Sequence, residues 1–301
     1  MDEASPRQRV FITGGTGFVG SAVRLALGDR QIRLLTRNSS DTGMANGQVE
    51  WVTGEVTDPD SLRGTMDGSA ALIHLVAIIK EIGDATFDRV IRQGTENVLA
   101  EAQRAGVSRV IYVSALGARN DPRFPYLNAK YEAETAVIGA GIPWTIFRPS
   151  VIFGPDDEFI NTLANLVRRA PVIPIVGDGT AKFQPVSVDQ VAKAIVRALD
   201  DPTTIGQRYD LGGGTIYTYE QMIDLLASKL KVRKLKVHVP VGVMRPVVSL
   251  SKVLPERLRP PVTEEQLKML AIDNATEASS TAALTGEPAM SLADGIEYVT
   301  R

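Results

Sequence analysis

Short apolar runs alternate with helical patterns through the first half of the chain. The apolar runs predict strands at Arg9–Thr13, Ile32–Thr36, Val49–Val52, Ala70–Leu75, Arg109–Ser114 and Trp144–Arg148. The segments between them predict helices at Phe18–Leu27, Asp58–Met66, Phe87–Ala105 and Tyr126–Ala140. Strands that alternate with helices in this way run parallel and are joined by right-handed crossovers. The fold class is therefore α/β, a doubly wound parallel Rossmann sheet.

The pattern becomes irregular after Pro149. A helix at Val188–Leu199 and a strand at Gln207–Leu211 are expected to return to the main sheet. We therefore predict a dinucleotide-binding domain from residues 1–150 plus about 186–212. A smaller, discontinuous C-terminal lobe for a substrate or a partner would comprise about 151–185 and 213–301.

A glycine-rich turn follows the first strand. Gly14, Gly17 and Gly20 recur at three-residue spacing around Thr16, Phe18 and Val19. In such a turn the first glycine permits the sharp bend, the second lets a pyrophosphate approach the backbone, and the third lets the helix pack closely. The phosphates then meet the free N–H groups at the positive end of the helix. A tight turn without a ligand is the alternative, but the long alternating array favours NAD(H) or NADP(H) binding.

The end of the second strand bears on the choice of dinucleotide. An acidic residue there would bind the ribose hydroxyls of NAD, but the chain has Arg37 and Asn38 instead. Because an arginine can pair with a 2′-phosphate, NADP(H) is preferred over NAD(H). The alternative is that Arg37 stacks on the adenine or faces solvent.

Tyr126 and Lys130 are four residues apart on a predicted helix and share a face. A free phenol is a poor acid or base at neutral pH, and a neighbouring ammonium is expected to lower its pKa. Proton exchange with a carbonyl or an alcohol then becomes feasible. A surface tyrosine with a solvated lysine is the alternative.

The composition narrows the classes of function. The chain has 301 residues, a net charge of −2 and no cysteine, so it shows no nucleic-acid footprint, forms no disulfide and holds no thiolate metal site. With only two histidines, we predict no metal site. The run Ala70–Ile79, interrupted by His74, falls short of the roughly 20 residues of a membrane span. The polar N-terminus lacks the pattern of a signal peptide, so we expect a cytoplasmic protein.

Three motifs stand in the order found in extended short-chain dehydrogenases/reductases, which the chain resembles over most of its length. They are the glycine turn, Tyr126-x-x-x-Lys130 and the segment 148–155, Arg-Pro-Ser-Val-Ile-Phe-Gly-Pro. Segments 113–118, 184–189 and 261–266 resemble the atypical branch of this family, which includes the nucleotide-binding accessory subunit of respiratory complex I and its bacterial relatives.

The resemblance implies roles for further residues. Glu55 and Val56 would lie near the adenine, although the family usually has Asp at the first position. Leu75, Val76 and Ala77 would line the cofactor, and Pro149, Ser150 and Val151 would approach the nicotinamide. Tyr126 would be the general acid/base, with Lys130 on the ribose and on the tyrosine. Ser114 would hold the substrate oxygen.

Two departures put vigorous catalysis in doubt. Ser114 comes slightly earlier than the family's serine or threonine, and Ile91 stands where an asparagine is usual. Missing hydrogen bonds lower transition-state stabilisation. Two functions therefore stay open. The first is an NAD(P)-dependent oxidoreductase of unknown substrate, which the intact Tyr126/Lys130 pair favours. The second is a non-catalytic, nucleotide-bound accessory or assembly factor of a membrane (respiratory-type) complex.

Residues 229–260 are strongly basic, with nine Lys and Arg against one acid, Glu256. If these cations and the interleaved apolar residues face outward together, they would attract anionic lipid or an acidic partner. We therefore expect a peripheral contact with a membrane or membrane complex through this stretch. A solvated basic edge strand with helix packing is the alternative.

Overall fold

The computed structural model describes residues 9–38, 43–45, 48–240, 242 and 264–300. The chain divides into two compact units. The first unit comprises Met1–Arg148 and Val191–Asp210, and the second comprises Pro149–Gln190 and Leu211–Arg301. Each unit is described by itself.

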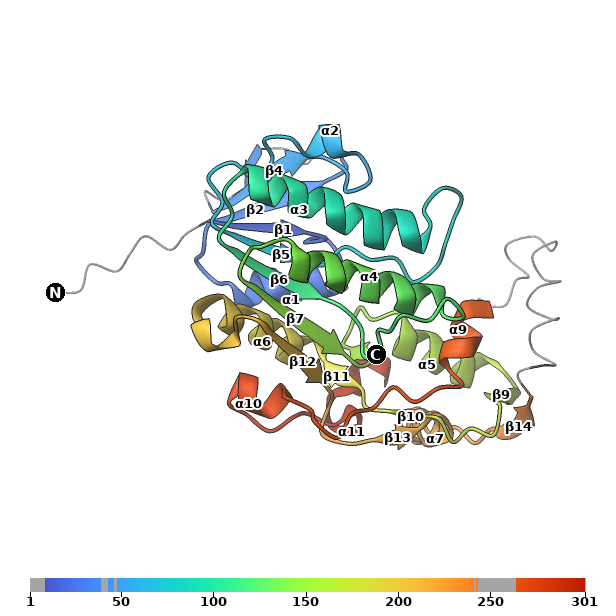
Figure 1. The fold of residues 1–301 in the computed structure, drawn as a ribbon. Coiled ribbons are helices and arrows are strands. Elements are labelled where there is room, and N and C mark those ends of the chain that lie inside the picture. The colour runs from blue at the N-terminus through green and yellow to red at the C-terminus, as the bar shows by residue number, and fades with distance from the viewer. Residues whose placement is uncertain (1–8, 39–42, 46–47, 241, 243–263, 301) are drawn as a thin grey trace. The chain divides into compact units, whose positions relative to one another are not determined.

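The first unit is built on one large sheet with the strand order β12-β7-β6-β5-β1-β2-β4-β3 (Figure 1). The six strands from β7 to β4 are joined by parallel ladders, and β3 pairs antiparallel at one edge. These strands are β1 (Val10–Thr13), β2 (Ile32–Thr36), β3 (Gly43–Ala45), β4 (Val49–Thr53), β5 (Ala71–His74), β6 (Arg109–Val113), β7 (Trp144–Pro149) and β12 (Gln207–Leu211). The predicted doubly wound Rossmann sheet is confirmed.

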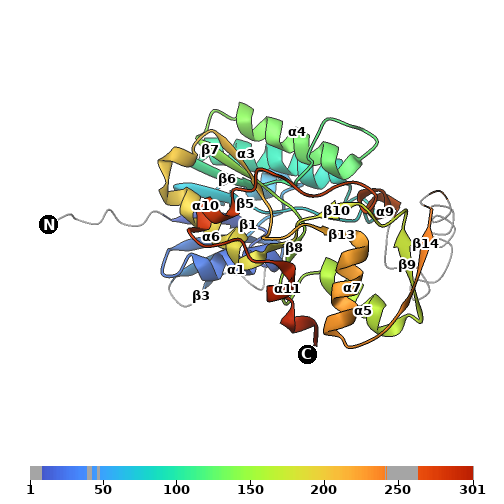
Figure 2. The same ribbon diagram turned by 90° about the horizontal axis from the view of Figure 1, so that it is seen from below.

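Helices cover both faces of this sheet. Helices α3 and α4 lie side by side on one face, and α1 and α6 lie on the other (Figures 1 and 2). The bounds are α1 (Phe18–Ala26), α2 (Pro59–Leu62), a π-helix η2 (Asp88–Gln93), α3 (Gly94–Arg104), α4 (Pro125–Gly139), α6 (Val188–Asp200) and a 3₁₀ turn η3 (Pro202–Thr204). Because both faces are covered, side chains such as Phe11, Leu72 and Ile111 are completely buried.

The sequence-based boundaries are wrong in three places. The helix expected over Asp58–Met66 ends after one turn, since Arg63 is extended and Gly64 has a positive φ of 83°. The helix expected over Phe87–Ala105 begins as the π-helix η2 and becomes α-helical only at Gly94. The short edge strand β3 was not expected at all.

The second unit has its own core around Phe153, Ile160 and Leu226. Helices α5 and α7 pack together beside the two-stranded parallel sheet β9–β14 (Figure 2). The elements are β8 (Ile152–Phe153), α5 (Phe159–Arg169), β9 (Val172–Val176), β10 (Lys182–Phe183), β11 (Val186–Ser187), β13 (Tyr217–Thr218), α7 (Tyr219–Lys229), β14 (Leu235–Val239), α9 (Glu264–Met269), α10 (Thr281–Thr285), α11 (Leu292–Gly295) and η6 (Glu297–Thr300).

The basic stretch 229–260 falls in this unit, and its residues 241 and 243–260 lie outside the described residues. Three cations at its start contact neighbouring groups. Lys236 contacts Glu220 at 2.7 Å and Asp224 at 2.8 Å, and Lys229 pairs with Glu297. Lys234 donates to the carbonyl of Ala170 at 2.8 Å. In the described part, Lys229 and Lys236 thus form ion pairs and Lys234 contacts a backbone carbonyl.

Candidate functional site

The carboxyl ends of the parallel strands meet at one edge of the sheet. Gly14 follows β1, Arg37 follows β2, Glu55 lies just beyond β4, Leu75 follows β5 and Ser114 follows β6. The strand order reverses between β1 and β5, which pair directly. Ligands of open α/β sheets bind at such a switch point. The fold therefore brings the predicted first-unit residues to the edge where a dinucleotide would bind.

The glycine turn leaves no room for side chains at two positions. Gly14 has a positive φ of 72°, and a Cβ there would stand 3.1 Å from the backbone of Leu75. A Cβ on Gly20 would stand only 2.2 Å from the carbonyl oxygen of Gly14. Helix α1 thus lies directly on the turn, as the glycine spacing predicts.

The N-terminus of α1 is open to a ligand. Gly17 is its N-cap, no side chain accepts a hydrogen bond from the first turn, and no acidic residue lies in that turn. Thr16 and Gly17 are exposed, and Phe18 and Val19 are half-buried. A Cβ on Gly17 would meet only the carbonyl oxygen of Gly14, at 3.4 Å. Free N–H groups and the helix dipole favour a phosphate here, so this surface fits a pyrophosphate.

The segment expected near the adenine is fixed by neighbouring helices. Asn97 of α3 donates to the carbonyl of Val56 at 2.9 Å, and the N–H of Glu55 donates to Ser61 Oγ at 2.9 Å. Val56 is buried and Glu55 exposed. Asn97 was not singled out from the sequence, although it fixes this loop.

Two further groups of predicted cofactor residues line the same edge. Arg37 and Asn38 are exposed, and the backbone N–H of Asn38 donates to Thr36 Oγ1 at 3.1 Å. After β5, Leu75 and Val76 are half-buried and Ala77 is exposed. These residues are therefore accessible to a bound molecule.

Helix α4 carries the Tyr126/Lys130 pair. It begins at Pro125, whose fixed φ suits the first helical position and whose missing N–H costs nothing there. The ring of Tyr126 is half-buried and packs edge-on against Phe87, with centroids 5.6 Å apart. Lys130 is buried, donates to the carbonyl of Val113 at 2.8 Å and lies 5.1 Å from the ring centroid of Tyr112.

The pKa shifts in this pair differ from the sequence-based expectation. Burial raises the pKa of Tyr126 to about 12, where the neighbouring lysine was expected to lower it. Burial also lowers the pKa of Lys130 to about 7, and the carboxylate of Glu134 opposes that shift. The expectation was wrong because removal of water from the phenol disfavours the phenolate, and the ammonium lies over Tyr112. The phenol of Tyr126 is thus protonated at neutral pH.

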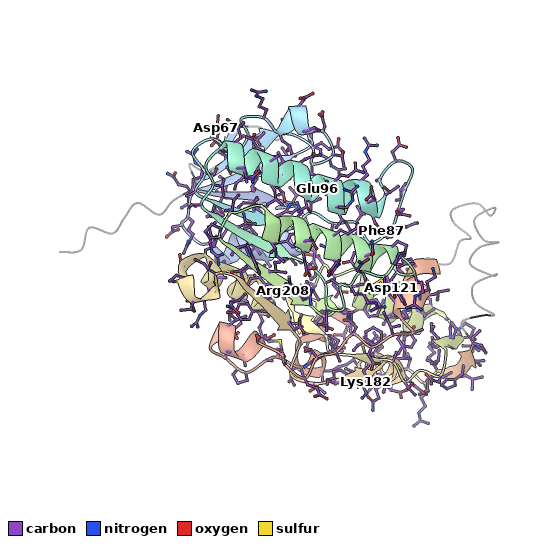
Figure 3. All side chains as sticks on the ribbon, in the orientation of Figure 1. Asp67, Phe87, Glu96, Asp121, Lys182 and Arg208 are labelled. Carbon is purple, nitrogen blue, oxygen red and sulfur yellow. The ribbon has the colours of Figure 1, made fainter. Side chains whose placement is uncertain are left out.

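Two buried groups stand beside this pair. Ser114 is buried, and its Oγ has no hydrogen-bond partner among the described residues. A buried hydroxyl of this kind normally has a partner, so a ligand oxygen fits the position. Glu134, one turn beyond Lys130, accepts from Arg148 Nε at 2.8 Å and from Arg148 Nη2 at 2.6 Å. Arg208, which is labelled in Figure 3, approaches Glu134 at 3.9 Å.

A buried hydrogen-bond chain that the sequence did not reveal lies beneath the glycine turn. His74 Nδ1 is 2.5 Å from Thr13 Oγ1, and His74 Nε2 is 2.9 Å from Thr95 Oγ1. Thr95 donates to the carbonyl of Ile91 at 2.5 Å, so its oxygen accepts from Nε2–H and Thr13 donates to Nδ1. The one available signal was a polar His74 interrupting an apolar run. The chain ties β1, β5 and η2 together around a neutral imidazole.

The neutral state of His74 predicts a loss of stability in mild acid. Burial, assisted by the charge of Lys130, lowers the pKa of His74 from 6.5 to about 3. Between these values the unfolded chain binds a proton that the folded chain does not, so the free energy of unfolding falls as pH falls. The expected slope is about 1.4 kcal/mol per pH unit below pH 6.5. Urea unfolding from pH 7.5 to pH 5 measures it.

A matched pair of variants isolates this effect. His74→Gln and His74→Asn, neither of which can titrate at this position, should both flatten the slope between pH 6.5 and pH 5. Equal slopes in the wild-type protein and His74→Gln would show that the imidazole does not stay neutral.

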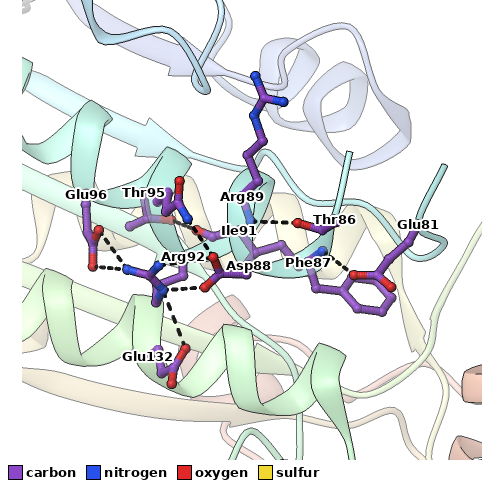
Figure 4. A network of polar contacts seen from close by, with 11 residues as sticks. Glu81, Thr86, Phe87, Asp88, Arg89, Ile91, Arg92, Thr95, Glu96 and Glu132 are labelled. Carbon is purple, nitrogen blue, oxygen red and sulfur yellow. Dashed lines mark hydrogen bonds and ion pairs between the residues drawn. The ribbon is translucent and has the colours of Figure 1, made fainter. Parts of the chain in front are cut away.

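The family that the chain resembles usually has an asparagine at the position of Ile91, which lies in the π-helix η2. Ile91 is completely buried and contributes only its carbonyl. Arg92 of η2 contacts Asp88 at 2.5 Å, Glu96 of α3 at 3.0 Å and Glu132 of α4 at 3.7 Å (Figure 4). These contacts fix η2 against the helix that carries Tyr126. The amide side chain of η2, on Gln93, donates to Asp88 Oδ2 at 2.6 Å.

Pro149, Ser150 and Val151 belong to the second unit. Ser150 is buried, and its Oγ donates to Asn274 Oδ1 at 2.7 Å. The N–H of Val151 donates to the same oxygen at 3.1 Å. The approach of these three residues to a nicotinamide stays a prediction.

Comparison with known proteins agrees with this geometry. Residues 14–202 match the family model described as NAD(P)H-binding. The chain is 32% identical over 243 residues to the mitochondrial NADH dehydrogenase [ubiquinone] 1 alpha subcomplex subunit 9 of Arabidopsis thaliana, covering 77% of this chain and 60% of that protein. It is 34% identical over 190 residues to the ceramide reductase of Caulobacter vibrioides, covering 62% of this chain and 59% of that protein. The chain thus spans about three fifths of the length of either relative.

A solved structure extends the likeness to the whole fold. The dTDP-glucose 4,6-dehydratase DesIV of Streptomyces venezuelae, crystallised with NAD and TYD, superposes with a TM-score of 0.74. The match covers 97% of this chain and 96% of that one at 20% identity. At this identity the likeness concerns the fold alone.

Proposed function

The chain belongs to the NAD(P)H-binding family and is an extended, atypical relative of the short-chain dehydrogenases/reductases, and on that premise we propose that it is an NADP(H)-dependent oxidoreductase acting on a carbonyl or alcohol. The observation that carries the proposal is the open N-terminus of α1 above the glycine turn, at the same sheet edge as Tyr126, Lys130 and Ser114. The second unit would hold the substrate or a partner.

The residues of the turn would bind the dinucleotide as follows. The backbone N–H groups of Phe18, Val19 and Gly20 would receive the pyrophosphate, while Val56 and Leu75 would flank the adenosine half. When bound, a reduced nicotinamide supplies a hydride for a carbonyl carbon, which the chain's own side chains cannot do.

The chain's own residues would move the proton. The neutral hydroxyl of Tyr126 would donate it to the substrate oxygen, because burial keeps the phenol protonated at neutral pH. Ser114 Oγ would donate a second hydrogen bond to that oxygen. Lys130, with a pKa of about 7, would restore the proton to the phenol and hold a ribose hydroxyl. Turnover of a carbonyl panel with NADPH tests the proposal.

The choice of NADP(H) over NAD(H) rests on Arg37 at the end of β2. Its guanidinium is exposed at the sheet edge, where a 2′-phosphate would lie. We expect Arg37→Gln to weaken NADPH binding about 10- to 100-fold, the value of one charged hydrogen-bonded pair, and to leave NADH binding unchanged. Calorimetric titration with both cofactors measures the difference.

A charge control sharpens the experiment. Arg63→Gln removes an exposed arginine of the same unit that follows α2, and should change neither affinity. Equal losses for NADPH and NADH in Arg37→Gln would assign Arg37 to the adenine face, and unchanged affinities would leave it in solvent.

A nucleotide-bound accessory subunit is the second candidate function. A relative of the chain is a subunit of a respiratory NADH dehydrogenase, and buried Ile91 replaces an amide that would support catalysis. This candidate predicts bound NADPH that neither exchanges nor is oxidised by any carbonyl of the panel. Exchange with turnover would exclude it.

A peripheral membrane contact, with a cytoplasmic location, accompanies either candidate. No helix in the described ranges has the length and hydropathy needed to cross a bilayer. The contact would use the basic stretch 229–260, where Leu235 and Val237 of β14 are 66% and 45% exposed. Co-sedimentation with anionic vesicles at low salt should succeed and should weaken in Leu235→Ser. Failure to bind at low salt would exclude lipid docking.

A further inference from the structure

The loop between β5 and η2 presents apolar side chains to solvent. Ile79 is 45% exposed and Ile82 is 68% exposed. Ile78 and Ala85 of the same loop turn inward and pack against the core of the first unit. Exposed isoleucines are unfavourable in water, so these two side chains would gain free energy if an apolar ligand covered them.

The loop holds these side chains in place. The backbones of Ile82 and Ala85 exchange two hydrogen bonds of 3.2 and 3.1 Å around Gly83, which has a positive φ of 56°. The carboxylate of Glu81 accepts from the N–H of Phe87 at 2.8 Å, and Thr86 Oγ1 accepts from the N–H of Arg89 at 3.1 Å (Figure 4). The apolar surface is therefore preorganised, which lowers the entropy cost of binding.

Apolar contacts lead from this loop to the proton donor. Phe87, the last residue of the loop, packs edge-on against Tyr126. Val76, Ile78 and Tyr126 all pack on the same core cluster as Phe87. The burial that raises the pKa of Tyr126 to about 12 reflects these apolar surroundings. Phe87, Val76 and Ile78 thus place apolar side chains of the loop in the same cluster as the phenol.

The charges of the loop do not suit an anionic substrate. Lys80 is the only cation in residues 77–86, beside two acids, Glu81 and Asp84. The next cation, Arg89, lies 4.0 Å from Asp84. A nucleotide or phosphorylated substrate would need several cations here. A hydrocarbon chain needs none.

We propose that the substrate carries a long alkyl chain, which lies against Ile79 and Ile82 while its carbonyl or hydroxyl group reaches Tyr126. This substrate class rests on the proposed oxidoreductase function. Each methylene buried on the loop should improve binding about fourfold until the chain outgrows the surface.

A homologous series tests the proposal with the full-length protein. Straight-chain aldehydes from propanal to dodecanal are reduced with NADPH, and the matching alcohols displace the neutral apolar dye N-phenyl-1-naphthylamine without cofactor. Both kcat/KM and displacement should rise steeply with chain length. The Ile79→Ser/Ile82→Ser variant should flatten both slopes. Leu25→Ser, which changes an 84% exposed leucine on α1, should keep them.

The outcomes separate this inference from the function on which it rests. Turnover that is independent of chain length, or equal slopes in the isoleucine variant, would overturn the alkyl-chain inference alone. Chain-length-dependent dye displacement that requires the isoleucines, without any turnover, would retain the apolar ligand and reject the oxidoreductase. If the isoleucine variant loses vesicle binding but keeps the dependence of kcat/KM and dye displacement on chain length, the loop is a membrane contact and the inference is overturned.

Discussion

Replacing Gly20 with valine is expected to abolish dinucleotide binding and to lower the free energy of unfolding by about 3 kcal/mol. A Cβ at this position would stand 2.2 Å from the oxygen of Gly14 and 2.6 Å from the Cα of Gly15. Both atoms belong to backbone, so neither can rotate away. Helix α1 would have to move off the turn, and its N–H groups would move with it. Urea unfolding and calorimetric titration with NADPH measure the two effects.

Gly17→Ala separates affinity from folding. Its Cβ would meet only the oxygen of Gly14 at 3.4 Å, an ordinary contact, and the backbone there has a φ of −78° that alanine accepts. We expect near-native stability and NADPH binding weakened about 10- to 100-fold, because a methyl group stands where the pyrophosphate would approach. Gly139→Ala, with open space around its Cβ inside α4, is the matched control and should change neither binding nor folding adversely. Unchanged affinity in Gly17→Ala would place the phosphates elsewhere.

Tyr126→Phe is expected to lower kcat about 10²- to 10⁴-fold, the usual value of a positioned general acid. Phenylalanine preserves the edge-on contact with Phe87, so folding and NADPH affinity should not change. Steady-state kinetics on the best substrate of the panel, with titration as the binding control, provide the measurement. Turnover that survives the substitution would assign the proton to another group.

Lys130→Met is expected to lower activity while it raises the free energy of unfolding. The folded pKa of about 7 lies below the ordinary lysine value of 10.5, so the unfolded chain binds this proton more tightly. The resulting penalty on the fold is complete below pH 7 and disappears only above pH 10. Methionine removes it, and we expect a gain on the order of 2 kcal/mol at pH 6 after loss of the hydrogen bond to Val113. Lower stability together with lost activity would mean that the ammonium is structural.

The sequence was sufficient for the parts of the fold that depend on neighbouring residues. The strand Ile32–Thr36 and the start of α1 at Phe18 were predicted at their observed residues, because a buried parallel strand and a glycine-capped helix leave local patterns. Strand β3 could not be predicted, since Gly43–Ala45 has no apolar alternation and exists only through its pairing with β4.

In the site too, the features that depend on neighbouring residues could be predicted from the sequence. The glycine turn and the Tyr126/Lys130 pair have characteristic spacings, but Thr13, His74 and Thr95 meet only because three segments converge. The direction of the Tyr126 pKa shift was also beyond the sequence. The four-residue spacing places a lysine on the same face, but the path of its side chain to Val113 and the packing of Phe87 on the phenol are tertiary features.

A crystal structure of the protein grown with NADPH tests the central claim most directly. The predicted result is a pyrophosphate within hydrogen-bond distance of the N–H groups of the first turn of α1, with the 2′-phosphate beside Arg37. Dinucleotide bound at any other surface, or an empty glycine turn at saturating NADPH in a folded protein, would contradict the claim.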